Sequence, residues 1–132
     1  MKKTSLSFIF AALTIAFGSI MTPAASAAEL TGSWQKHAVS TSGTWTITAD
    51  SVTLHDLKTG RAPDLKLILS PHAVDALESE NAMEGAIVIT PIKDSKGTFT
   101  FALPEGVDLS QFQSIGIHCE RYTKLFAKAS LS

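Results

Sequence analysis

The chain has 132 residues, a formal net charge of −1 and a single cysteine. This length supports one domain with its own hydrophobic core. Its 11 basic and 12 acidic residues nearly balance, and Lys and Arg do not cluster, so the sequence gives no electrostatic basis for binding nucleic acid or an anionic membrane.

The first 27 residues read as a secretory signal peptide. Lys2 and Lys3 precede the apolar run 6–21, and Ala-Ser-Ala at 25–27 supplies the small residues that a signal peptidase reads. The apolar run is short for a membrane span, which needs about 20 residues. We therefore expect cleavage after this tripeptide, a single domain over residues 28–132, no membrane anchor after cleavage, and a periplasmic or secreted location.

Short strands and turns account for the first half of the mature chain. After a loose lead-in at 29–33, alternating side chains and β-branched residues predict strands at 34–39, 44–49, 52–57 and 64–69. Ser70 followed by Pro71 is typical of a helix start, so one or two helical turns are expected as far as Leu77.

The second half continues with strands at 86–92 and 97–103, a corner at 108–113, and a strand pair over 114–131. In that pair the apolar residues fall on odd positions, which predicts a core-facing side made of Ile115, Ile117, Cys119, Leu125, Ala127, Ala129 and Leu131. Arg121 and Thr123 interrupt the series, so a bulge or corner is expected just after Cys119.

About seven or eight short strands with frequent turns, and no long helical period, indicate an all-β protein. We expect a single-domain antiparallel β-sandwich or flattened barrel with at most one short helical turn.

The lone thiol of Cys119 is the main candidate for chemistry. In an exported protein it is buried and inert, pairs with another molecule, or takes part in redox or metal chemistry. Arg121 would lie on the same face of a regular strand and could stabilise a thiolate. His118 would point the opposite way, where we expect it to face solvent. Without a second cysteine, a redox cycle needs a partner protein or a small thiol. An intermolecular disulfide is possible, and the oligomeric state stays open.

Several segments, taken together, resemble the DM-thirteen (DM13) domain family of small exported domains, which are often found beside DOMON domains. They are GTWTIT at 43–48, VTLHDL at 52–57, and Ala62-Pro63-Asp64-Leu65, where the family carries Gly-Pro-Asp-Leu. The closing segment 102–131 is similar too, with a Leu-Pro, a Val-Asp-Leu corner and a cysteine in the next strand. The resemblance covers nearly the whole mature chain.

The resemblance implies an all-β domain whose cysteine, here Cys119, acts in redox or electron transfer. It also implies that Pro63 and Asp64 lie near the functional end. This chain departs from the family at His118, where Trp is usual, at Ala62, where the first Gly stands, and at Ala127, where Gly often follows the final Phe.

Other chemistry is less well supported. No zinc-ligand spacing and no haem-attachment motif is present, so no cofactor is evident, although haem or a metal is not excluded. Trp34 and Trp45 are core aromatics or an exposed sugar platform, and Glu78, Glu80 and Glu84 read as a solvated loop. No complete catalytic set is visible. The first hypothesis is an exported domain with a redox-active Cys119, and the alternative is a binding module for a sugar, metal, haem or envelope protein in which Cys119 only packs.

Overall fold

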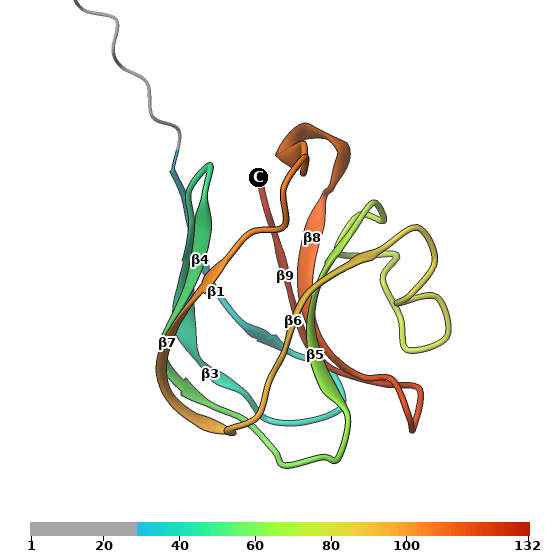
Figure 1. Ribbon diagram of the computed structural model, residues 1–132. Helices are drawn as coiled ribbons and strands as arrows, with labels where there is room; N and C mark the ends of the chain where they lie inside the picture. Colours follow the sequence, from blue (N-terminus) through green and yellow to red (C-terminus); the bar gives the residue numbers. More distant parts are fainter. Residues whose placement is uncertain (1–28) are drawn as a thin grey trace, which may run out of the picture.

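The computed structural model describes residues 29–132, and in them two antiparallel sheets face each other (Figure 1). One sheet has the strand order β1-β3-β4-β7 and the other β2-β9-β8-β5-β6. The strands are β1 (Leu30–Ser33), β2 (Gln35–Lys36), β3 (Ser42–Ile47), β4 (Ser51–Lys58), β5 (Leu65–Ser70), β6 (Ile87–Pro91), β7 (Lys96–Ala102), β8 (Ser114–Cys119) and β9 (Lys124–Ser130). The predicted all-β antiparallel sandwich is confirmed. The predicted signal peptide lies outside the described residues.

The N-terminal part of the domain differs from the prediction. Residues 30–33, expected to be a lead-in, form β1 and pair with β3. The strand expected at 34–39 is regular only over β2, although the N–H groups of His37 and Val39 also donate to the carbonyl of Phe126. Trp34 separates β1 from β2, so the chain passes from one sheet to the other at this buried residue.

Among residues 29–132, the helix that forms lies outside the segment 70–77, where helical turns were expected. Residues 71–77 hold only a single turn, in which the Leu77 N–H donates to the Ala73 carbonyl at 3.0 Å. A 3₁₀ helix forms instead at Leu109–Gln111, inside the predicted corner. Asp108 caps it by accepting hydrogen bonds from Ser110, and these bonds lower the pKa of the Asp108 carboxyl. Within residues 29–132, no helix is long and apolar enough to cross a bilayer.

The main core lies between the two sheets and follows the predicted alternation except at β-bulges, one of which moves a predicted core residue. The pairing of β8 with β9 shifts between Ile117, which faces Ala127, and His118, which faces Leu125, so Phe126 is an extra residue. The shift sends Leu125 to the outer face of the five-stranded sheet, where it packs in a second cluster with the residues Ile68, Leu77 and Ala82. The prediction that Leu125 shares the core face with Ala127 is therefore wrong, because one added residue inverts the alternation.

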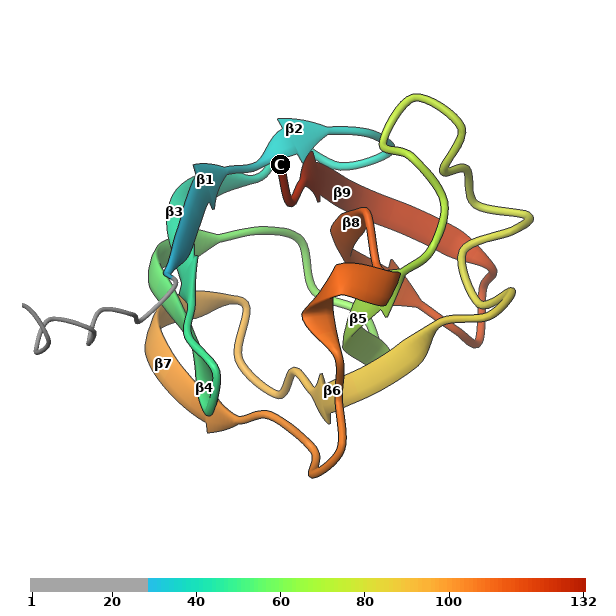
Figure 2. The ribbon, with the colours of Figure 1, turned by 90° about the horizontal axis from the view of Figure 1, so that it is seen from above.

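Residues 71–86, here called the cover segment, run along the outer side of the five-stranded sheet (Figure 2, yellow-green). Leu77 and Ala82 of this segment are fully buried against the sheet. The central strands β5, β8 and β9 of the five-stranded sheet are thus largely buried on both faces, whereas the outer face of the four-stranded sheet stays open.

Candidate functional site

The residues singled out in the sequence meet at one end of the five-stranded sheet. In the pairing of β5 with β8, Leu65 faces Cys119 and Lys66 faces His118. Pro63 and Asp64 form the turn just before β5, and the Asp64 carbonyl accepts the N–H of Glu120 at 3.1 Å. The turn Glu120–Thr123 then leads into β9. This end, called the Cys119 end below, brings together two segments that are more than 50 residues apart in sequence.

Cys119 itself is sealed inside the protein. The residue is free, 0% exposed, and part of the main core between the sheets. The side of the strand agrees with the prediction, and the expected corner follows directly as the turn 120–123. A thiol needs access and a stabilised thiolate to react, and a buried site in apolar surroundings provides neither.

Arg121 is not placed to stabilise a Cys119 thiolate in this conformation. It lies in the turn, where its side chain is exposed, and it makes no ion pair or hydrogen bond within the part of the chain that the structure describes. The chain turns before Arg121, so the regular strand that would align it with Cys119 ends too early. Tyr122 follows it and is 63% exposed, the large hydrophobic side chain that stands out on the described surface.

His118 lies on the face opposite Cys119, as strand alternation predicts, but it does not face solvent. It is 1% exposed, because the outer face of its sheet is covered, and its Nδ1 has no hydrogen-bond partner among residues 29–132. Burial lowers the pKa of the imidazole, and the nearby carboxylates of Glu120 and Asp64 oppose that shift. Burial therefore favours the neutral form of the His118 ring, although carboxylates lie nearby.

Lys66 was not singled out in the sequence, yet it links the two segments of the Cys119 end. Its ammonium group donates to the Glu120 carboxylate and lies 3.5 Å from Oδ1 of Asp64. The hydrogen bond to Glu120 is the main cause that raises the pKa of Lys66. Alternation from Leu65 places Lys66 on the outer face, but only the fold shows which carboxylates it meets.

A family model described as electron transfer DM13 matches residues 33–131. The chain belongs to the DM13 family. The match includes Pro63, Asp64, His118, Cys119 and Arg121, and it confirms the resemblance drawn from the sequence. No curated protein and no solved structure matches the chain.

A cavity of about 260 Å³ adjoins the Cys119 end of this DM13 domain. Arg61, Lys93 and Asp94 line it with polar groups, and Leu65 forms part of its wall. Because Leu65 is the cross-strand neighbour of Cys119, the cavity approaches the thiol without including it among its lining residues.

The structure of the DM13 domain also tests the predictions for the two tryptophans and for the acidic loop. Trp34 and Trp45 are core aromatics with exposures of 8% and 1%, so they form no exposed sugar platform. Glu80 and Glu84 are exposed, as predicted for a solvated loop. Within residues 29–132, no group of three His, Cys, Asp or Glu side chains is arranged to hold a metal ion.

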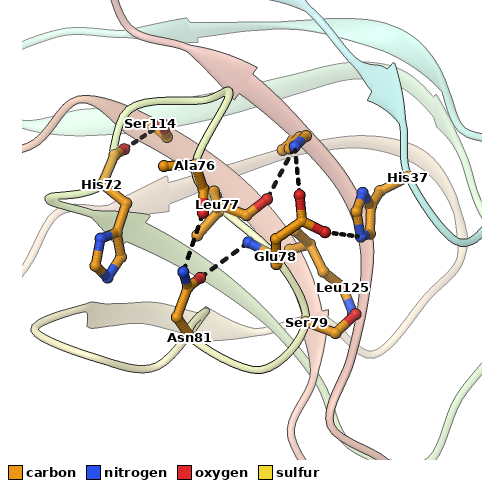
Figure 3. Close-up of polar contacts among 10 residues, drawn as sticks. His37, His72, Ala76, Leu77, Glu78, Ser79, Asn81, Ser114 and Leu125 are labelled. Carbon is orange, nitrogen blue, oxygen red and sulfur yellow. Dashed lines mark hydrogen bonds and ion pairs between the residues drawn. The ribbon is translucent and has the colours of Figure 1, made fainter.

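Glu78 has a structural role that the sequence did not reveal (Figure 3). Its carboxylate lies 3.8 Å from the Lys128 ammonium and 3.5 Å from Nε2 of His37. The same Lys128 donates to the Leu77 carbonyl at 2.8 Å. These contacts fasten the cover segment of the DM13 domain to β9 and to the residue that follows β2.

Proposed function

We propose that this DM13 domain is exported and works in electron transfer with a separate redox partner, which it meets at the Cys119 end. Membership of an electron-transfer family supports the redox part of the proposal. The leader-like sequence of residues 1–27 supports export.

The observation that carries the proposal is the meeting of the turn at Pro63–Asp64 with the segment 118–121 at one end of the sheet. Arg121 and Tyr122 project from the same end and are exposed. Arg and Tyr are enriched at protein interfaces, where they supply large contact area and directional hydrogen bonds. A partner that docks here would lie close to Cys119 and His118.

For Cys119 we propose a role that requires local opening. With the Glu120–Thr123 turn closed, the sulfur is out of reach. Once the turn opens, the Cys119 thiolate would attack one sulfur of a partner's disulfide, forming a mixed disulfide while the partner's other sulfur leaves as a thiolate. The proton released from Cys119 passes to solvent. Lys66 would keep the turn closed through its pairing with Glu120.

A second candidate function is favoured by the 0% exposure of Cys119: a partner-binding module in which this residue only packs. Free cysteines often behave as small buried hydrophobes. The two candidates differ in whether the thiol is reached by local or by global unfolding.

The test is the labelling rate of Cys119 by a chromogenic disulfide reagent, measured against urea below the unfolding transition. Local opening exposes little surface, so we expect a rate that is nearly independent of urea, and a faster rate in Lys66→Met, which lacks the ammonium group. The matched control is Lys36→Met, a change at an exposed position on β2. Incubation in a glutathione redox buffer should then add one glutathione per chain by intact mass.

A labelling rate that follows global unfolding at every urea concentration, equally in both lysine variants, would establish the packing role of Cys119 and end the thiol proposal.

A further inference from the structure

The Cys119 end gathers most of the basic side chains of the domain. The pairing of Cys119 with Leu65 and with Lys124 puts the start of β5 and the β8–β9 turn at this end, and the Ile92 N–H, just after β6, donates to the Leu65 carbonyl at 2.9 Å. Figure 1 shows the loops that join β4 to β5, β6 to β7 and β8 to β9 together at the lower end of the sandwich. These loops and the strand ends beside them carry seven of the nine Lys and Arg residues in 29–132: Lys58, Arg61, Lys66, Lys93, Lys96, Arg121 and Lys124.

Six of these seven side chains are exposed and unpaired. Lys66 binds Asp64 and Glu120, whereas the other six side chains make no ion pair or hydrogen bond with any residue in 29–132. Like charges that face each other across a strand pair are destabilising, and Lys58 directly faces Lys96 in the pairing of β4 with β7. This arrangement costs stability in the isolated domain, and an anionic partner would relieve the repulsion.

Carboxylates are distributed in the opposite way. The Cys119 end has four of them, and Lys66 pairs with two of the four. The β3–β4 turn, the connection 103–113 and the cover segment hold no Lys or Arg but seven acidic residues: Asp50, Asp75, Glu78, Glu80, Glu84, Glu105 and Asp108. The domain is therefore polarised, with its positive charge at the Cys119 end. Because the seven cations are spread from residue 58 to residue 124, only folding brings them together.

The cavity of about 260 Å³ lies within this basic end. Arg61 reaches it from the β4–β5 loop and Lys93 from the β6–β7 loop, so two unpaired cations line one recess. Asp94 lines it as well and offsets part of their charge. A single carboxylate side chain that enters the recess would meet both cations, whereas a second one beside it would meet Asp94.

We propose that the redox partner docks on the Cys119 end through an acidic protein surface. A positive patch that meets a negative one steers the encounter and fixes the orientation of the two proteins. The acidic cover segment and the acidic opposite end would repel the same partner, so docking is directed to the end that holds Cys119. Tyr122, which is 63% exposed, adds aromatic contact area of the kind that protein interfaces use.

The mixed charges of this end favour a protein over nucleic acid or an anionic membrane. Duplex DNA presents one negative charge about every 1.7 Å, so its phosphates would also face the exposed carboxylates of Asp56 and Asp94. A membrane of anionic lipids would do the same. A protein surface can place carboxylates opposite the cations and leave neutral or basic groups opposite these two aspartates.

This inference rests on the proposed function only for the redox nature of the partner. Binding of an acidic probe is measured without reference to the thiol. A packing role for Cys119 would therefore leave the acidic-surface docking standing, and a failure to bind acidic probes would leave the thiol labelling test unaffected.

The experiment is an NMR titration of the ¹⁵N-labelled protein with a short peptide of alternating Glu and Ser, at about 20 mM salt, where screening is weak. We expect amide shifts confined to the Cys119 end, their loss at about 200 mM salt, and no shifts there with a peptide of alternating Lys and Ser. Lys93→Gln should weaken binding about two- to fivefold, as for one exposed ion pair. Gln111→Glu changes the net charge by the same amount at an exposed position of the opposite end, and it should bind like the wild type.

Three results would overturn the proposal: no shifts at low salt, shifts spread evenly over the domain, or equal losses in Lys93→Gln and Gln111→Glu. A duplex oligonucleotide and vesicles of anionic phospholipid are the further arms of the experiment. Tighter binding of either one at the Cys119 end, compared per negative charge with the peptide, would assign this end to that class of partner and end the proposal of an acidic protein.

Discussion

His118 shows how the environment of one residue depends on a distant part of the chain. Its neighbour Cys119 points into the main core, so strand alternation sends His118 outward. That side is closed because the cover segment packs over the sheet, and the ring becomes 1% exposed. An uncharged imidazole is favoured there because the charged form would lose its hydration.

The lowered pKa of His118 predicts that the protein loses stability as pH falls below about 6.5, the ordinary pKa of histidine. The unfolded chain takes up a proton at this position before the folded chain does, so acid favours unfolding until the folded-state pKa is passed. The free energy of unfolding, measured with urea at pH 5, 6, 7 and 8, should depend less steeply on pH in His118→Gln than in the wild type.

The matched comparison is His55→Gln, the same substitution on β4 of the other sheet, and the effect of His118→Gln is measured against it. An NMR titration that places the midpoint of the His118 ring at or above 6.5 would contradict the argument.

The strand pair β8–β9 illustrates how far the sequence could predict the elements. Period-two alternation predicted both strands. In a strand with one face on the core, apolar and polar residues alternate along the sequence, so this kind of strand can be recognised without the fold. The same pattern misplaced Leu125, since the bulge at Phe126 leaves no local signal that distinguishes it from regular strand. Bulges are set by pairing with another strand, so they become visible only in the fold.

Strand β1 was missed for a related reason. Gly32 faces Trp45 across the pair, and a Cβ at this glycine would lie 2.4 Å from the Trp45 ring. The indole therefore occupies the space that a side chain would fill, and the strand lacks the apolar alternation that identifies strands in sequence.

For the candidate site, only the family resemblance placed Asp64 near Cys119, since no local sequence pattern connects the two residues.

The cover segment depends on a few polar contacts as well as on its apolar cluster. Lys128→Met keeps the length of the side chain but removes the donor to the Leu77 carbonyl and the charge beside Glu78. We expect a loss of about 1.5–3 kcal/mol in the free energy of unfolding, as for a hydrogen bond to a charged group. Faster hydrogen exchange of the Leu125 amide, which donates to Ser79 Oγ, should accompany it.

Lys124→Met is the control for this prediction, because Lys124 lies on the same strand and is exposed. Its change should stay within about 0.5 kcal/mol. Equal effects of the two substitutions would show that Lys128 does not hold the cover segment.

At the scale of the whole molecule, Trp34 joins the two sheets. It separates β1 of one sheet from β2 of the other and packs in the main core at 8% exposure. The core is shared by both sheets, so they should unfold in one cooperative transition.

Trp34→Ala should lower the free energy of unfolding by about 3–5 kcal/mol, the usual loss for a buried Trp. This loss is a large fraction of the whole free energy of unfolding of a domain, which is about 5–15 kcal/mol. Trp34→Phe should lose much less, since it keeps an aromatic ring and removes an indole N–H that has no partner among residues 29–132. In the Trp34 variants, far-UV circular dichroism follows the unfolding of both sheets together. The fluorescence of Trp45, the remaining tryptophan, follows the four-stranded sheet. Midpoints that differ between these two signals would argue against a shared core.

Tyr122 gives the molecule a natural reporter. It is the chain's one tyrosine and stands 63% exposed in the turn that follows Cys119. Biosynthetic incorporation of fluorotyrosine would therefore yield a single fluorine resonance at the proposed docking end. The arrival of another protein at that end could then be followed in solution with every native side chain position retained.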